Sequence, residues 1–185
     1  MTKEKTHDLN SNWVLWVHKV DDHDWERTSY IEIFKFKTIE DYWYIYNNWE
    51  DLMPPLDNGI FFLMREGVFP KWEDKNNING GCWSLRVNKT EIKNMWNELS
   101  MASMGEYLTN NSDEKLNING LSISPKRNFC VIKIWTKRIV EGETDYFSPD
   151  IPFLDLKDSI YRKHIESLEA DREKLKDKLK QDFTK

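Results

Sequence analysis

The stretch FPKWEDKNNINGGCW, residues 69–83, decides how this chain is interpreted. Its middle is too hydrophilic for a protein core, yet it contains Trp72, which follows Phe69 and Pro70. A core role for one tryptophan in a polar loop is hard to arrange, because an indole needs a large pocket and a partner for its N–H. From the loop alone, binding and packing are equally good interpretations of Trp72. Residues 82–87 (CWSLRV), which begin at the end of this stretch, are predicted to form a strand.

The chain before this loop shows two strand patterns, then a helix and a third strand. Thr38 lies three residues before Asp41, the spacing of a capping box that starts a helix. Ile39, Trp43 and Tyr46 then follow the three-and-four spacing of a helical face. These patterns predict strands at residues 13–20, 29–37 and 59–64 and a helix at residues 39–49.

The chain after the loop shows a second helix and two further strand patterns. Thr90 is the expected cap of a second helix, in which Ile92, Trp96 and Leu99 lie on one face. That face predicts Trp96 to be a core residue. Two further strands are predicted at residues 115–124 and 129–138. The order β-β-α-β-β-α-β-β-α indicates an α+β domain, an antiparallel sheet with helices on one face.

From Ser159 the composition changes to charged helix formers with opposite charges three or four residues apart, which favours an exposed helix. Its apolar stripe is interrupted by Arg172 and is too short for a coiled coil. We expect one helix laid across the domain with a frayed charged end; a dimer or partner contact is the alternative. The predicted division is a flexible N-terminal segment (1–10), an α+β domain (11–158) and a C-terminal charged helix (159–185).

The composition points to a binding site for one planar group. Nine tryptophans in 185 residues are more than packing requires. The formal net charge of −5 argues against binding a long stretch of nucleic acid, which needs several basic contacts to displace counterions. A pocket lined by aromatic rings fits this balance better.

Motifs for catalysis or metal binding are missing from the sequence. The four histidines are scattered, and there is no H-E-x-x-H, G-x-S-x-G, P-loop or G-x-G-x-x-G. Cys82 and Cys130 do not form a CxxC pair and are interpreted as reduced thiols. No secretory signal or membrane span is apparent, so we expect a cytoplasmic protein. We expect no enzymatic activity, no cofactor and no metal.

Several segments, taken in order, resemble the translation initiation factor 4E family, which binds the 5′ cap of messenger RNA. The most specific are WED-x-x-N-x-x-GG-x-W, from Trp72, and IEDYW, from Ile39; the resemblance covers roughly residues 7–137. It implies a curved antiparallel sheet with helices packed on the convex face and a cap slot on the concave face. The other segments are HDLNSNWVLWV, Trp25, WNELSMASMGE and IKIWTK.

The resemblance assigns four residues to the cap base. Trp25 and Trp72 would hold 7-methylguanine between them, where stacking contributes about 1–3 kcal/mol per ring. The cationic base adds about 1–2 kcal/mol of cation–π attraction. Glu73, completed by the backbone N–H of Trp72, would accept from the N–H donors on the guanine edge. Trp135 would lie against the methyl group.

Each of these residues also has an ordinary structural interpretation. Taken alone, Trp25 is interpreted as a partly exposed surface ring and Glu73 as a solvated surface acid. Trp135, in an alternating strand, reads as core. Their ordered combination is what favours binding.

The basic residues that hold the cap phosphates in the family are only partly present. Two of these positions fall on Cys82 and Val131, which cannot bind phosphate. A third falls on Lys126, with Arg127 beside it, and Lys133 shares the strand face of Trp135. We therefore predict a weaker or rearranged grip on the triphosphate, through Lys126, Arg127 and Lys133.

The family also docks a short helical peptide of scaffold and repressor proteins on its helical side. Here Asp8 and Asn97 replace the usual proline and leucine, which would weaken or reshape that surface. The tryptophan central to that surface in the family falls on Trp43. As an alternative, Trp43 is simply helix core. The expected partner-binding residues are Ile39, Trp43, Glu98 and Met101.

The resemblance implies a factor that hands capped messenger RNA to a scaffold factor in translation initiation. Two alternatives stay open: a cap-binding repressor or decoy with a different partner, and a protein-interaction adaptor that has lost the cap. The expected partners are 7-methylguanosine nucleotides of capped messenger RNA and a scaffold factor or repressor, with no DNA and no membrane.

Overall fold

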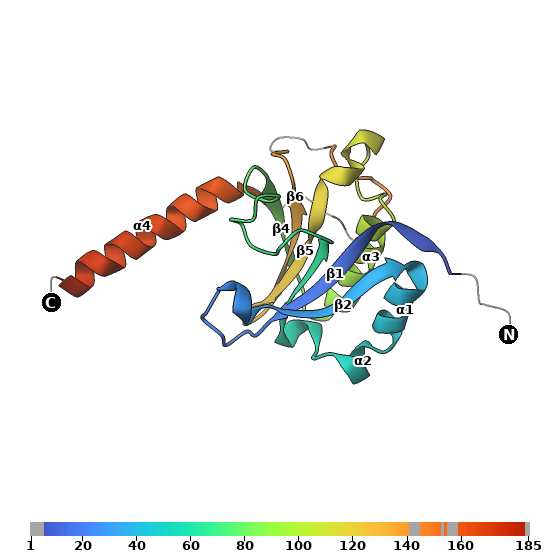
Figure 1. The fold of residues 1–185 in the computed structure, drawn as a ribbon, viewed down its shortest axis with the longest axis horizontal. Helices are drawn as coiled ribbons and strands as arrows, with labels where there is room; N and C mark the ends of the chain where they lie inside the picture. The colour runs from blue at the N-terminus through green and yellow to red at the C-terminus, as the bar shows by residue number, and fades with distance from the viewer. Residues whose placement is uncertain (1–5, 141–144, 153, 155–158, 184–185) are drawn as a thin grey trace.

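The computed structural model describes residues 6–140, 145–152, 154 and 159–183. It contains a seven-stranded antiparallel sheet in the order β2-β1-β3-β5-β6-β4-β7 (Figure 1). The strands are β1 (Asp8–His18), β2 (Ile31–Thr38), β3 (Ile60–Arg65), β4 (Gly81–Val87), β5 (Ile118–Pro125), β6 (Cys130–Thr136) and β7 (Ile160–Lys163). The helices are α1 (Ile39–Asn47), α2 (Trp49–Leu52), α3 (Ile92–Met104) and α4 (His164–Phe183), with 3-10 turns at Arg27–Ser29, Leu56–Asn58 and Ser112–Asn117.

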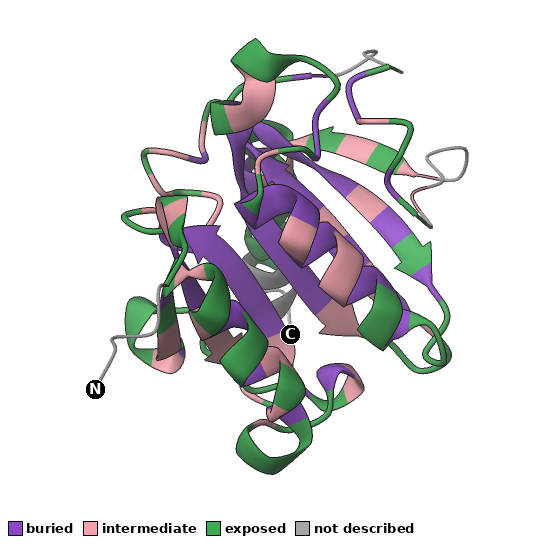
Figure 2. Cartoon of the chain, turned by 90° about the vertical axis from the view of Figure 1, so that its right-hand side faces the viewer, coloured by how far each residue is buried: buried purple, intermediate pink, exposed green. Residues whose placement is uncertain are grey.

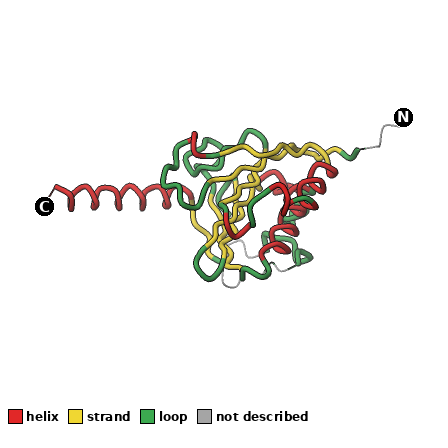
Figure 3. The backbone as a smooth tube through the Cα atoms, turned by 90° about the horizontal axis from the view of Figure 1, so that it is seen from below, coloured by secondary structure: helices red, strands yellow, loops and turns green. Residues whose placement is uncertain are grey.

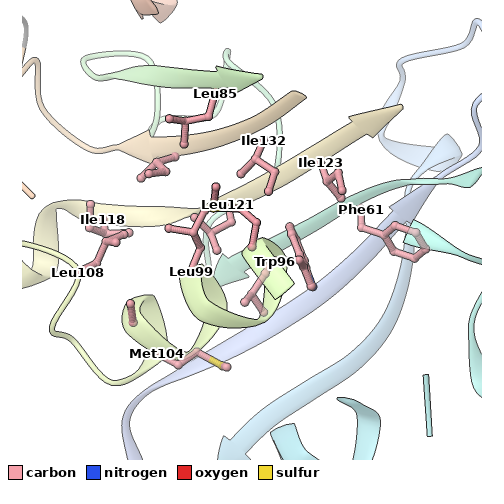
Figure 4. Close-up of a cluster of buried hydrophobic side chains, with 14 of the residues drawn as sticks. Phe61, Leu85, Trp96, Leu99, Met104, Leu108, Ile118, Leu121, Ile123 and Ile132 are labelled. Carbon is pink, nitrogen blue, oxygen red and sulfur yellow. The ribbon is translucent and has the colours of Figure 1, made fainter. Parts of the chain in front are cut away.

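Helices α1 and α3 cover one face of the sheet, and Figure 2 shows the buried strands behind them. The main core lies between α3 and the central strands (Figure 4). Leu99 of α3 is completely buried, as are Leu121 of β5 and Ile132 of β6. The predicted α+β architecture, with helices on the convex face, is confirmed.

The first helix begins as its sequence predicts. The Asp41 N–H donates to Thr38 Oγ1 (3.1 Å), and the Thr38 N–H donates to the Asp41 carboxylate (2.9 Å). This reciprocal capping box satisfies two backbone donors that helix formation leaves free. The prediction for α3 is wrong in detail, since Glu91 is its N-cap and makes no side-chain cap bond, so Thr90 does not cap it.

Several boundaries of strands and helices differ from the predictions. β1 starts at Asp8, before the expected domain boundary at residue 11, and β5 starts at Ile118 because the residues before it form a 3-10 turn. Residues 160–163, expected to be helical, form β7 and pair with β4. The free edge of β4 accepts this short strand, a long-range pairing that helix propensity does not report.

Helix α4 does not lie across the domain as expected. It starts at the end of β7 and projects away from the sheet, on the side opposite α1 and α3 (Figures 1 and 3). Every described side chain from residue 169 to residue 177 is exposed. The charged composition of α4 thus matches a solvated helix, attached to the domain only through its first turns.

The position of Trp96 yields a stability prediction. Its ring is 3% exposed and belongs to the core beneath α3, as its helical face predicts. Trp96→Ala should lower the free energy of unfolding by about 3–5 kcal/mol, measured by urea denaturation. The matched control is Asn94→Ala, at an exposed position on the same helix, which should change the free energy of unfolding little. Equal stability of both variants would show that Trp96 is not a core residue.

Candidate functional site

The face of the sheet opposite α3 contains a cavity of about 500 Å³. Successive side chains of a strand point to opposite faces, so the residues between the core positions of β5 and β6 point here. Ser122, Ser124, Lys133 and Trp135 occupy those positions and line the cavity. Trp25, Trp72 and Glu73 line it as well, so the structure brings together all four residues assigned to the cap base.

Trp135 forms the floor of the cavity. Its ring is 3% exposed, and its Nε1–H donates to Ser122 Oγ at 2.9 Å. The edge of Phe62 packs against it, with ring centroids 6.3 Å apart. A buried indole needs a partner for its N–H, and the adjacent strand supplies one. Trp135 is therefore held rigidly while its ring remains the floor of the cavity.

Buried amides fix the loop that presents Trp72 and Glu73. The side chain of Asn77, completely buried, donates to the carbonyls of Phe69 (2.9 Å) and Lys71 (2.8 Å). Asn119 of β5 in turn donates to Asn77 Oδ1 (2.9 Å). Such bonds replace the regular ladder that a loop lacks. Asn77 is the Asn of the WED-x-x-N motif, but its structural role was not predicted.

The glycine pair that ends this motif permits close backbone contact. A Cβ on Gly80 would lie 1.8 Å from the Thr136 carbonyl oxygen, and one on Gly81 would lie 2.5 Å from that of Arg162. Both distances are far below van der Waals contact. The loop can join β4 beside β6 and β7 only because these two positions lack side chains.

Trp25 lies on a second loop and is backed by a histidine. Its ring stacks on that of His18, with centroids 4.0 Å apart and an angle of 3° between the planes. The imidazole is itself fixed, because its two nitrogens lie 2.8 Å from the carbonyl oxygens of Lys19 and Asp24. The indole is 45% exposed, so His18 holds one of its faces while much of the ring remains accessible.

The two tryptophan loops touch each other. The Arg27 guanidinium lies over the Phe69 ring, 4.2 Å from its centroid, and Lys71 Nζ is 4.0 Å from a carboxylate oxygen of Glu26. Glu26 directly follows Trp25 and Lys71 directly precedes Trp72. Trp25 and Trp72 are thus on neighbouring loops, although 47 positions separate them in the sequence.

Glu73 is exposed and lines the cavity, as does Tyr30. Burial, and then the negative charge of Glu73, raise the pKa of Tyr30 well above its ordinary value. The Tyr30 hydroxyl is therefore neutral and a potential donor near this acid. The cavity combines aromatic rings with the carboxylates of Glu73 and Asp171, a combination suited to a cationic planar group that carries N–H donors.

Of the predicted phosphate-binding residues, only Lys133 lines the cavity. Its Nζ lies 5.2 Å from the centroid of the Trp72 ring. Lys126 and Arg127 lie at the turn between β5 and β6, outside the cavity lining, so their contact with phosphate stays a prediction. The Cys82 thiol is buried, and this burial raises its pKa.

His164, where β7 passes into α4, was missed by the sequence analysis. It is completely buried, with its ring 4.9 Å from that of Trp135 and 6.4 Å from that of Trp72. Burial and the nearby Lys133 ammonium lower the pKa of His164 to about 4. Nothing in the local sequence signals this contact, because it depends on β7 joining the sheet.

The residues expected to bind a partner lie on the helical side, opposite the cavity. Ile39 and Trp43 of α1 are 45% and 38% exposed, and Glu98 and Met101 of α3 are partly exposed. Asn97 Oδ1 accepts a 2.7 Å hydrogen bond from the Tyr42 hydroxyl, so this altered position joins α3 to α1.

Comparison with known proteins identifies the relatives of this chain. Residues 8–179 match the sequence profile of the family described as "Eukaryotic initiation factor 4E". The chain belongs to the eukaryotic initiation factor 4E family. Members of this family are translation initiation factors, not enzymes.

Two curated relatives illustrate the extent of the match. Initiation factor 4E of Candida albicans is 30% identical over 148 residues, 74% of this chain and 68% of that protein. The human factor 4E is 31% identical over 137 residues, 70% of this chain and 60% of that protein. The chain thus spans less than two thirds of the length of the human relative.

Solved structures of factor 4E proteins share the fold. The complex of Ascaris suum eIF4E-3 with the m7G cap aligns with a TM-score of 0.63 and 28% identity, over 74% of this chain and 77% of that one. The complex of Caenorhabditis elegans eIF4E-3 with the 4E-binding protein Mextli and a cap analog has a TM-score of 0.72 over 88% and 95%. At 24% identity, the latter supports the fold alone.

Two further classes of site are not found in the part of the chain that the structure describes. Its histidines, cysteines and acids form no group of three or more that could hold a metal ion. Among residues 6–140, 145–152, 154 and 159–183, no helix combines the length and apolar character needed to cross a membrane.

The bonds of Asn77 predict how the Trp72 loop responds to mutation. Asn77→Ala leaves two backbone carbonyls without their donor, which should cost about 1–3 kcal/mol of unfolding free energy, measured by urea denaturation. The matched control is Asn79→Ala, an exposed asparagine of the same loop, for which we expect no measurable loss. If the two variants were equally stable, the loop would not depend on these bonds.

The buried imidazole of His164 predicts a pH dependence. Its pKa is lowered from 6.5 to about 4 in the folded chain, so the unfolded chain takes up the proton first on acidification. The free energy of unfolding should fall between pH 6.5 and pH 4, by about 3 kcal/mol from this group, with no contribution above pH 6.5.

Urea denaturation of the wild type and of His164→Gln at pH 7, 5.5 and 4 measures this difference. The variant should lose less stability on acidification than the wild type. If both proteins lost the same free energy of unfolding between pH 7 and pH 4, His164 would have the same pKa in the folded and unfolded chains.

Proposed function

We propose that this chain binds the 7-methylguanosine 5′ cap of messenger RNA, in the cytoplasm and during translation initiation. The main observation behind this proposal is that one cavity is lined by four residues from separate segments, Trp25, Trp72, Glu73 and Trp135. Factor 4E of Ascaris suum, crystallised with an m7G cap, supports the proposal through its shared fold and 28% identity.

The chemistry of the base explains the need for two indoles. A 7-methylguanine ring is flat and positively charged, so it gains stacking from each of Trp25 and Trp72, about 1–3 kcal/mol per ring. The cationic charge adds attraction to the negative faces of the indoles, which grows as water is excluded. An unmethylated guanine keeps the stacking but lacks that charge, so methylation is recognised.

Glu73 supplies base specificity in this proposal. Its carboxylate, one residue after Trp72, would accept from the two adjacent N–H donors on the guanine edge. Adenine offers no such pair. Charge-assisted bonds of this kind are about twice as strong as neutral ones. Trp135, fixed by Ser122, would form the wall beside the methyl group.

We further propose that the exposed rings of α1 bind a helical peptide of a scaffold factor, which would then recruit the capped messenger RNA. Trp43 is the centre of this surface, with Ile39 one turn earlier. Schistosome eIF4E, solved with m7GpppG and 4E-BP, has 25% identity and a TM-score of 0.66 to this chain. Glu98 and Met101 of α3 would contribute to the same surface.

A cap-binding repressor is the second candidate, and position 97 favours it. The amide of Asn97 is bonded to Tyr42, which places a polar group where an apolar side chain would deepen the peptide pocket. A changed pocket would select a different partner while the cap site is retained.

The central prediction concerns Trp72. Trp72→Ala should reduce retention on 7-methylguanosine resin at least about tenfold, because it removes one stacking surface and part of the cation–π attraction. Glu73→Gln should also weaken binding, since the amide carries a donor where an acceptor is needed. Tryptophan fluorescence quenching by methylated and unmethylated nucleotides gives the affinities.

Trp43→Ala is the matched control for this experiment. It removes a tryptophan from the opposite side of the sheet and should retain the cap, but lose a co-purifying scaffold factor. Unfolding midpoints should be unchanged in all three variants. Full retention by Trp72→Ala would show that the base does not stack on Trp72. A wild-type chain that is not retained on the resin would disprove the cap proposal and leave the interaction adaptor as the remaining hypothesis.

A further inference from the structure

The imidazole of His18, at the end of β1, has hydrogen-bond acceptors at both of its nitrogens. The ring is completely buried, with Nδ1 2.8 Å from the Lys19 carbonyl oxygen and Nε2 2.8 Å from that of Asp24. A backbone carbonyl can only accept a hydrogen bond, so each ring nitrogen needs a proton to make its contact. A neutral imidazole has one N–H and one lone pair, and could satisfy only one of the two carbonyls. The geometry therefore matches the doubly protonated, cationic ring.

A buried cation is costly unless its surroundings compensate it, and those of His18 do so. Hydrogen bonds from a charged donor are stronger than neutral ones. The indole face of Trp25, parallel to the imidazole at a centroid distance of 4.0 Å, attracts a cation as well. A neutral ring would instead hold a lone pair against a carbonyl oxygen, which leaves a buried acceptor unsatisfied. Both contacts thus favour the cationic form of His18.

The ionisable groups nearest to His18 do not take the place of these carbonyls. The Tyr30 ring lies edge-on to it, with centroids 5.1 Å apart, and the raised pKa of Tyr30 keeps its hydroxyl neutral. The Asp24 carboxylate accepts from the backbone N–H of Glu26 (2.8 Å). Among the residues that the structure describes, no carboxylate lies within salt-bridge distance of the imidazole. The two carbonyls and the Trp25 ring are therefore the groups that compensate its charge.

We propose that His18 is a doubly protonated positioning residue that fixes Trp25 and limits its selectivity for the methylated base. The inference rests on the proposed cap function and deepens it. Asp24 directly precedes Trp25, so the bond from His18 Nε2–H to the Asp24 carbonyl holds the backbone that carries the indole. His18 covers one face of that indole, which lines the cavity and is 45% exposed, so the base would stack on the other face.

A 7-methylguanine base in this position would place two cations on opposite faces of one indole. Both would be attracted to the same ring electrons. Their centres would lie roughly 8 Å apart, where two unit charges still repel each other if little water lies between them. Unmethylated guanine is neutral and meets no such repulsion. His18 would therefore support the stacking of both bases while opposing part of the gain from methylation.

The charge of His18 can be measured without any ligand. Long-range 1H–15N spectra of the full chain, labelled at the histidine ring nitrogens, distinguish a ring with two protons from a ring with one. The His18 signals are assigned through their nuclear Overhauser contacts with the Trp25 ring. At pH 6.5 both nitrogens of His18 should carry a proton. One unprotonated nitrogen would overturn the inference, whatever the chain binds.

The effect on selectivity is measured with the triphosphates of 7-methylguanosine and guanosine, which differ in the methyl group and its charge. Tryptophan fluorescence quenching of the full chain at pH 6.5 gives both affinities. His18→Phe keeps a flat ring behind Trp25 but removes the charge and both hydrogen bonds. It should weaken binding of the unmethylated nucleotide, because the Trp25 loop is less well fixed. It should also raise the ratio of methylated to unmethylated affinity by about two- to fivefold, because the repulsion is gone.

The matched control is His23→Phe, at an exposed position of the same turn, which should leave both affinities and their ratio unchanged. A purely structural role of His18 would weaken both nucleotides equally and leave the ratio unchanged, which would overturn the inference. The same ratio change in both variants would also overturn it, since that would indicate a general effect of charge. A wild-type chain that binds neither nucleotide would instead disprove the cap proposal, and the spectra would still decide the charge of His18.

Discussion

A β-strand presents alternate side chains to opposite faces of its sheet, and β5 and β6 use this constraint to build the core and the candidate site together. Leu121 and Ile132 pack under α3, whereas Ser122 and Trp135 face the cavity and bond to each other. A shift of one residue in the pairing would exchange the two sets. The register that stabilises the domain therefore also places the floor of the site.

Loops, rather than strands, carry the two indoles proposed to stack on the base, and each loop is held by buried polar groups. Asn77 bonds the Trp72 loop from below, while His18 stacks behind Trp25 and is bonded to its loop. Ordering a side chain on binding costs conformational entropy. Rings that are already supported lose less of it, so these contacts favour tight binding without touching the ligand.

The C-terminal part of the chain forms one side of the cavity. β7 extends the sheet, and His164 directs α4 outward beside Trp72 and Trp135. The same burial that anchors the helix depresses the pKa of His164, which couples acid stability to the geometry of the site. Arg172 then reaches the cavity from a helix that is otherwise solvated.

The sequence by itself determined the antiparallel α+β plan, the capping box of Thr38 and the residues proposed to contact the base, because periodicity, helix caps and an ordered motif are local or collinear signals. It did not determine β7, the role of His164 or the contact of α4 with the cavity. These depend on which strand pairs with the free edge of β4 and on the direction in which the chain leaves it. Such long-range pairings are decided only by tertiary packing, since residues distant in sequence leave no local pattern of their contact.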